Sequence, residues 1–84
     1  MSGVHANFEA LEGVVTTATT LTFNRRSRKI IITNDHASKS LTYKFNSSET
    51  AGTLKPTETL SLYFTTERVI IDGDGVPYRI WIFG

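Results

Sequence analysis

Near the end of the chain, residues 78–83 read YRIWIF. Because side chains alternate between the two faces of a β-strand, Ile80 and Ile82 lie on one face of this stretch, and Trp81 and Phe83 lie on the other. A stretch that is apolar on both faces is typical of a central strand, or of a strand that a second sheet or a partner covers. The sequence therefore predicts a strand here, inside a sheet or under a covering surface.

Six further stretches have the pattern of a β-strand. They are residues 14–17, 21–23, 30–32, 41–45, 60–65 and 69–71. Polar turn formers separate these stretches, and no window of the sequence has the apolar 3.6-residue period of a helix. About seven short strands at this spacing predict an all-β fold, which is either a small antiparallel β-sandwich or a jelly-roll-like barrel.

The length of 84 residues suits a single domain, which we expect to span residues 12–84. Residues 1–11 precede the first expected strand, so we expect an N-terminal arm there, whose removal would leave the fold intact. Phe8 and Leu11 would be the apolar anchors of this arm. A domain this small has a thin core, so neighbouring subunits are expected to stabilise it.

The composition argues against several classes of function. Nine Lys and Arg face eight Asp and Glu, for a formal net charge of +1. This balance does not supply the basic field that binding to nucleic acid or to an anionic membrane usually needs. The absence of cysteine removes disulfides and most zinc sites. No stretch approaches the roughly 20 apolar residues of a membrane span, and no signal peptide is evident. We therefore expect neither a membrane nor nucleic acid as a partner.

Few side chains could support catalysis or hold a metal ion. His36 follows Asp35 in an expected loop, but a hydrolytic site also needs a nucleophile, and no G-x-S-x-G motif is present. Residues 72–75 read DGDG, which is similar to the start of a calcium loop, but Phe83 stands where the closing glutamate would be. We interpret both stretches as turns, and we expect no catalytic residue, no metal site and no cofactor.

The one basic run, RRSRK at residues 25–29, lies between two expected strands. A solvated turn explains it, and a contact of Arg25, Arg26 and Arg28 with an acidic protein patch is the functional alternative.

Aromatic side chains offer a second kind of contact. Trp81 is expected to pack in the core or against another subunit. If Tyr63, Tyr78 and Trp81 point outward together, they could instead form a platform that binds carbohydrate.

Several stretches between residues 30 and 84 also have the look of a known protein family. They are residues 32–35, 41–46, 52–62, 69–73 and 76–81. The spacing L-x-x-x-E-x-L-x-L at residues 54–62 and the sequence PYRIW at residues 77–81 resemble small β-sandwich structural proteins of tailed bacteriophages. Such proteins lie on heads, at connectors or along tails, and the resemblance transfers no catalytic residue.

The resemblance implies a non-enzymatic structural protein of the virion. The expected role is a capsid decoration or cement subunit that binds the major capsid protein of the head lattice, as a homo-oligomer such as a trimer. A head-tail connector, a tail or baseplate component, and a carbohydrate-binding module for host recognition are the alternatives. The residues expected at the contact are Phe8, Leu11, Arg25, Arg26, Arg28 and Trp81.

Overall fold

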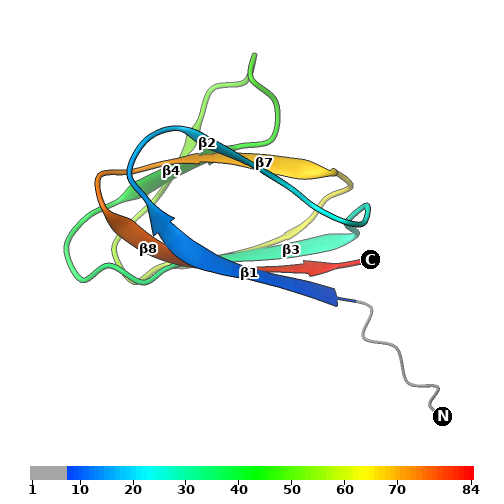
Figure 1. The fold of residues 1–84 in the computed structure, drawn as a ribbon, viewed down its shortest axis with the longest axis horizontal. Helices are drawn as coiled ribbons and strands as arrows, with labels where there is room; N and C mark the ends of the chain where they lie inside the picture. The colour runs from blue at the N-terminus through cyan, green and yellow to red at the C-terminus, as the bar shows by residue number, and fades with distance from the viewer. Residues whose placement is uncertain (1–7) are drawn as a thin grey trace, which may run out of the picture.

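The computed structural model describes residues 8–84, which form eight β-strands. The strands are β1 (Phe8–Val15), β2 (Thr19–Thr22), β3 (Lys29–Asn34), β4 (Leu41–Lys44), β5 (Gly52–Leu54), β6 (Thr59–Tyr63), β7 (Arg68–Asp72) and β8 (Val76–Phe83). They form two four-stranded sheets, with the strand orders β1-β8-β3-β6 and β2-β7-β4-β5. The two sheets lie one above the other as the layers of a sandwich (Figure 1).

The strands pair from the ends of the described chain inward. β1 pairs with β8, β2 with β7, β3 with β6 and β4 with β5, and every pair is antiparallel. The chain is therefore one long hairpin whose paired ribbon winds through both sheets, which is the connectivity of a jelly roll. The predicted all-β sandwich is confirmed, and the strand order that the sequence left open is the jelly-roll order.

The core lies between the two sheets and consists of the side chains that alternate inward. They are Val15, Phe23, Ile30, Ile32, Leu41, Leu54, Val69, Ile71, Val76, Ile80 and Ile82. β3, β7 and β8, which the sequence shows as apolar on both faces, are all central strands of their sheets. Each fully buried isoleucine on β3 and β8 contributes about 1.5–3 kcal/mol relative to an exposed one, so these strands hold the sandwich together.

The structure contains eight strands where the sequence predicted about seven, because β5 was not foreseen. β5 is only three residues long, so it has no visible alternation, and it forms by pairing with β4. Gly52 leaves space at its start, since a Cβ there would lie 2.5 Å from the Cζ atom of Tyr43 and the ring would have to move. The glycine lets the Tyr43 ring lie across β5.

The structure also moves the start of the domain from the expected residue 12 back to Phe8. Residues 8–11 pair with the end of β8, Phe8 opposite Phe83 and Leu11 opposite Ile80. A charged residue, Glu9, obscures the strand pattern in the sequence. Its carboxylate accepts hydrogen bonds from the backbone N and Nδ2 of Asn24, at 2.9 and 3.3 Å. Residues 1–7 of the expected arm lie outside the described residues.

Candidate functional site

The two sheets differ in the side chains that point away from the core. On the β1-β8-β3-β6 sheet the outward side chains are mostly apolar or aromatic. They are Phe8, Ala10, Glu12, Val14, Lys29, Ile31, Thr33, Thr59, Ser61, Tyr63, Pro77, Arg79, Trp81 and Phe83. We call this surface the aromatic face.

The outward side chains of the β2-β7-β4-β5 sheet are polar, with one exception. They are Thr20, Thr22, Thr42, Lys44, Thr53, Arg68, Ile70 and Asp72. Hydroxyl and charged groups are readily solvated, whereas a surface with several exposed or half-buried rings often marks an interaction site. The contrast singles out the aromatic face as the candidate functional surface.

The centre of the aromatic face is an apolar strip that crosses three neighbouring strands. Trp81 of β8 lies in register between Ala10 of β1 and Ile31 of β3. Beside this row, the rings of Phe83 and Phe8 lie 5.9 Å apart between their centroids. Phe8 is 44% exposed. The strip is continuous because β8, the strand with two ring side chains on this side, is central in its sheet.

Two cations lie over the rings of this face. Lys29 Nζ is 5.2 Å from the centroid of the Tyr63 ring, and Tyr63 is 80% exposed. The guanidinium carbon of Arg79 is also 5.2 Å from the centroid of the Trp81 ring. Aromatic rings and arginines together are the side chains most often found at the energetic centre of a protein interface. The composition of the face is therefore that of a docking surface.

Asp35 fixes the position of Arg79. Arg79 Nε donates to Asp35 Oδ2 at 2.7 Å, and Arg79 Nη2 donates to Asp35 Oδ1 at 3.0 Å. The hydrogen bonds that Arg79 donates to Asp35, and the negative charge of Asp35, raise the pKa of Arg79, and the nearby charge of Glu12 adds to this effect. The bidentate geometry holds the guanidinium beside Trp81 before any partner arrives.

Shallow hollows lie along the β1–β8 side of the aromatic face. One is lined by Ala10, Glu12, Trp81 and neighbours, and the next by Glu12, Val14 and neighbours. Both hollows share Glu12 and Arg79. Apolar side chains of a partner could therefore insert into these two hollows, and the carboxylate of Glu12 and the guanidinium of Arg79 lie between them.

A separate hollow lies at one end of the sandwich, where the rings of Phe45 and Phe64 are 4.8 Å apart between their centroids. Most of its charged lining is engaged within the chain. Arg26 Nη2 lies 3.6 Å from Glu67 Oε2, and Glu49 Oε1 accepts the backbone N–H of Phe45 at 2.7 Å. These contacts engage Arg26, Glu67 and Glu49 within the chain, and Arg68 is the remaining charged residue of the lining.

The structure separates the contact residues expected from the sequence. Phe8 and Trp81 both lie on the aromatic face. Leu11 lies on the inner side of β1 and packs against the core, so it is not an exposed anchor. The sequence did not single out Ile31, and it offered Tyr63 only for sugar binding. The place of Ile31 beside Trp81, and of Tyr63 across Lys29 from Phe83, depends on the strand order, which local patterns do not reveal.

The three arginines of the basic run lie in or next to the loop between β2 and β3, and they do not act as one group. Arg26 pairs with Glu67, and the side-chain stem of Arg25 lies close to Gly84. Arg28 is exposed directly before β3, next to Lys29 at the end of the aromatic face. Only this last part of the run is near the candidate surface.

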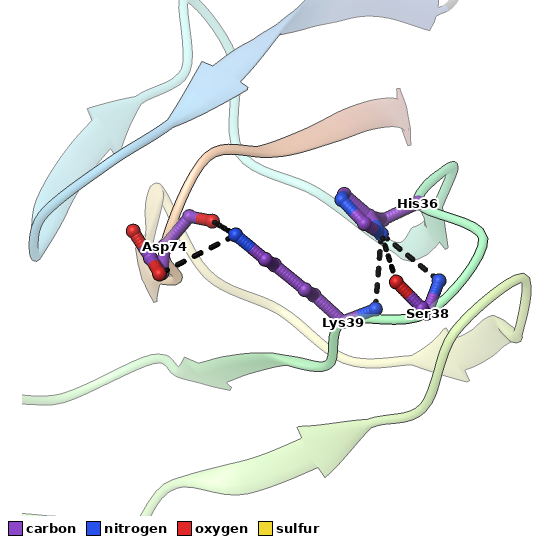
Figure 2. Close-up of polar contacts among 4 residues, drawn as sticks. All are labelled: His36, Ser38, Lys39 and Asp74. Atoms are coloured by element: carbon purple, nitrogen blue, oxygen red, sulfur yellow. Dashed lines mark hydrogen bonds and ion pairs between the residues drawn. The ribbon is translucent and has the colours of Figure 1, made fainter.

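The residues considered for catalysis and for calcium have structural contacts. His36 Nδ1 accepts the backbone N–H groups of Ser38 and Lys39, both at 2.9 Å. Lys39 Nζ in turn reaches the tip of the DGDG turn, where it donates to the backbone oxygen of Asp74 at 3.0 Å (Figure 2). Figure 2 shows the His36 loop joined in this way to the turn between β7 and β8. These contacts connect the two turns.

The sugar platform considered from the sequence is not assembled as expected. Tyr78 is partly buried and packs against the core, so it does not share the outer surface with Tyr63 and Trp81. Arg79 lies over the Trp81 ring, where a sugar ring would have to stack. The face is therefore better suited to a protein partner than to a carbohydrate.

No family model, curated protein or solved structure matches this chain. Within residues 8–84, no cluster of three or more His, Asp or Glu side chains is placed to hold a metal ion. The same part of the chain contains no helix that is long and apolar enough to cross a membrane. A function is therefore inferred from the side chains on the outer surfaces of the two sheets.

Proposed function

We propose that this protein is a non-enzymatic structural subunit of a virus particle, and that it packs through its aromatic face against another protein subunit. The observation that carries the proposal is the contrast between the two outer surfaces of the sandwich. One surface has threonines and charges, and the other has Phe8, Trp81 and Phe83 in a continuous strip. Leaving such a strip in water is unfavourable, and covering it with a partner is favourable.

The fold supports this role without defining it. Jelly rolls occur in viral capsid proteins, and also in lectins and cupins, so the fold alone does not identify a function. The resemblance of residues 54–62 and 77–81 to phage structural proteins favours the virion. Repetition on a lattice would add avidity to contacts that are individually weak, which suits a small domain. Within the virion, decoration of the head is the role we favour.

Purified particles of the phage that encodes the chain provide the test. Trp81→Ser removes the central ring of the aromatic face, and Ile70→Ser removes the one outward apolar side chain of the opposite sheet. We expect Trp81→Ser to weaken the binding of the chain to the particle at least about tenfold, and so to lower the number of copies per particle, since a central aromatic anchor typically contributes more than 1.4 kcal/mol. We expect Ile70→Ser to leave the copy number unchanged.

The copy number itself separates the positions in the particle. Hundreds of copies of the wild-type chain support a decoration subunit, and six or twelve support a connector or a tail component. The absence of the chain from the particles, or equal incorporation of both variants, would overturn the proposal. Circular dichroism of both purified variants verifies that they retain the fold.

A further inference from the structure

We propose that the partner of the aromatic face is the aromatic face of a second copy of this chain, related by a two-fold axis that passes through Trp81. The proposal rests on the proposed function only in taking this face as the docking surface. It adds the identity of the occupant, and it follows from how charge is distributed around the apolar strip.

The strand register places two opposite charges symmetrically around Trp81. Glu12 of β1 lies opposite Arg79, which is two residues before Trp81 on β8. Lys29 of β3 lies opposite Phe83, which is two residues after Trp81. β1 and β3 flank β8 on opposite sides. Trp81 is therefore the midpoint of the line from Glu12 to Lys29, and each charge is about 8 Å from it, given the usual strand spacing and rise per residue.

Neither of these two side chains forms an ion pair within residues 8–84, although Glu12 lies beside the Asp35–Arg79 pair and contributes to the raised pKa of Arg79. The ion pairs among residues 8–84 are Arg26 with Glu67, Lys39 with Asp74 and Arg79 with Asp35. Because Asp35 compensates Arg79, the surplus charges of the aromatic face are the carboxylate of Glu12 on one side and the ammonium of Lys29 on the other. Lys29 lies over the Tyr63 ring, which keeps its Nζ on the outer side of the sheet.

A second copy satisfies both charges at once. The two aromatic faces stack around a two-fold axis that lies between them and passes through Trp81. This axis is perpendicular to the line from Glu12 to Lys29. Each Glu12 therefore lies over the Lys29 of the other copy. Such a closed two-fold contact uses the same patch on both subunits. The strands of the two copies then cross at about 70°, close to the orthogonal class of sheet packing. The two tryptophans meet at the centre.

The size of the face limits the strength of this contact. The outward side chains cover only four strands, about 4.8 Å apart, so the buried area stays below the roughly 800 Å² per partner of a standard interface. We therefore expect a reversible dimer that forms at high protein concentration, and that becomes stable when a lattice holds many copies together.

Charge reversal with sedimentation equilibrium tests the pairing. The samples are the purified full-length chain, Glu12→Lys, Lys29→Glu and a 1:1 mixture of the two variants, each up to about 1 mM, the range in which weak dimers populate. We expect the wild type to dimerise and each variant alone to dimerise at least about tenfold more weakly, because both charge contacts become repulsive. In the mixture both contacts are attractive again, so we expect a heterodimer with nearly wild-type affinity.

The outcomes distinguish the possible occupants. Lys44→Glu reverses a lysine on the polar outer surface of β4, so it should leave the dimer unchanged. A separate acidic partner protein would bind Glu12→Lys more tightly and Lys29→Glu more weakly, whereas self-pairing weakens with both changes. A wild type that stays monomeric at about 1 mM, or a mixture that associates no better than the single variants, would overturn the proposal.

Self-pairing can fail while the proposed function stands. If the charge-reversed variants enter particles like the wild type and Trp81→Ser does not, the aromatic face is a docking surface for a different virion protein. If Trp81→Ser also enters particles normally, the aromatic face is not the docking surface. Circular dichroism of each variant confirms that a lost interaction is not a lost fold.

Discussion

At the scale of single residues, the side chain of Asn34 connects three separate parts of the fold. Its side chain is fully buried at the end of β3. Nδ2 donates to the backbone oxygens of Lys39 at 2.8 Å and Leu54 at 3.0 Å, and Oδ1 accepts the backbone N–H of His36 at 2.8 Å. One amide thus connects β3, the following loop and β5 of the other sheet, with both of its donors used.

Replacement of Asn34 by Leu should therefore destabilise the domain by about 2–4 kcal/mol, since three backbone groups lose their partner and at least one stays buried. That is a large part of the roughly 5–10 kcal/mol expected for a domain of this length. Urea unfolding followed by circular dichroism measures the change. Asn46→Ala is the control, because Asn46 is exposed and its side chain bonds only within its own turn, to Ser48. Equal midpoints for the two variants would refute this account of Asn34.

The same residue shows what sequence patterns can and cannot predict. The faces of Ile80 and Trp81 follow from alternation alone, and the structure confirms them. Asn34 reads as a turn residue in the sequence, because polar residues follow it directly. Its role becomes visible only when Leu54, twenty residues away, is placed beside it. Long-range contacts of this kind have no local signature.

At the scale of elements, the turn between β5 and β6 contains a strained residue. Thr57 has a φ of +63°, a backbone conformation that β-branched residues rarely adopt. It follows Pro56 in a turn closed by the bond from the backbone N–H of Glu58 to the oxygen of Lys55, at 3.0 Å. Proline followed by a residue with positive φ is the arrangement in which glycine is normally found.

We expect Thr57→Gly to stabilise the protein by about 1 kcal/mol, because relief of the backbone strain exceeds the added entropy of the unfolded chain. Thermal unfolding should show a higher midpoint. The matched control is Thr53→Gly on the outer side of β5, where φ is not positive and the same change should lower the midpoint. A lower midpoint for Thr57→Gly would show that the turn is not strained in solution.

Two parts of the fold, β5 and the first half of β1, were not predicted because their sequence patterns are weak. β5 has three residues and exists through its pairing with β4. The first half of β1 contains Glu9, whose charge breaks the apolar alternation and is satisfied by Asn24. In both cases tertiary contacts outweigh the local pattern. A long strand with apolar side chains on both faces, such as β8, can be predicted from its sequence alone.

At the scale of the whole molecule, the first and last strands close the sandwich together. β1 pairs with β8 along its entire length, from Phe8 opposite Phe83 to Val15 opposite Val76. Because the pairs are nested, contacts between distant parts of the sequence dominate the fold. The expectation that residues 1–11 could be removed without harm therefore needs revision.

A chain that begins at Glu12 should unfold at a lower urea concentration than one that begins at Phe8. It loses the pairing of four residues with β8 and the burial of Leu11 against the core. We expect a difference of at least about 2 kcal/mol in the free energy of unfolding. Both chains lack residues 1–7, so the comparison isolates the first half of β1. Indistinguishable unfolding curves would mean that this half does not contribute to the sheet in solution.

The central claim is that the aromatic face is buried against protein in the assembled state. Hydroxyl-radical footprinting with mass spectrometry tests it directly, by comparing the oxidation of Trp81 and Tyr63 in intact particles and in the isolated chain at low concentration. We expect both side chains to be protected in particles, while Ile70 on the opposite sheet keeps its reactivity. Oxidation of Trp81 and Tyr63 that is equal in the two samples would contradict the claim.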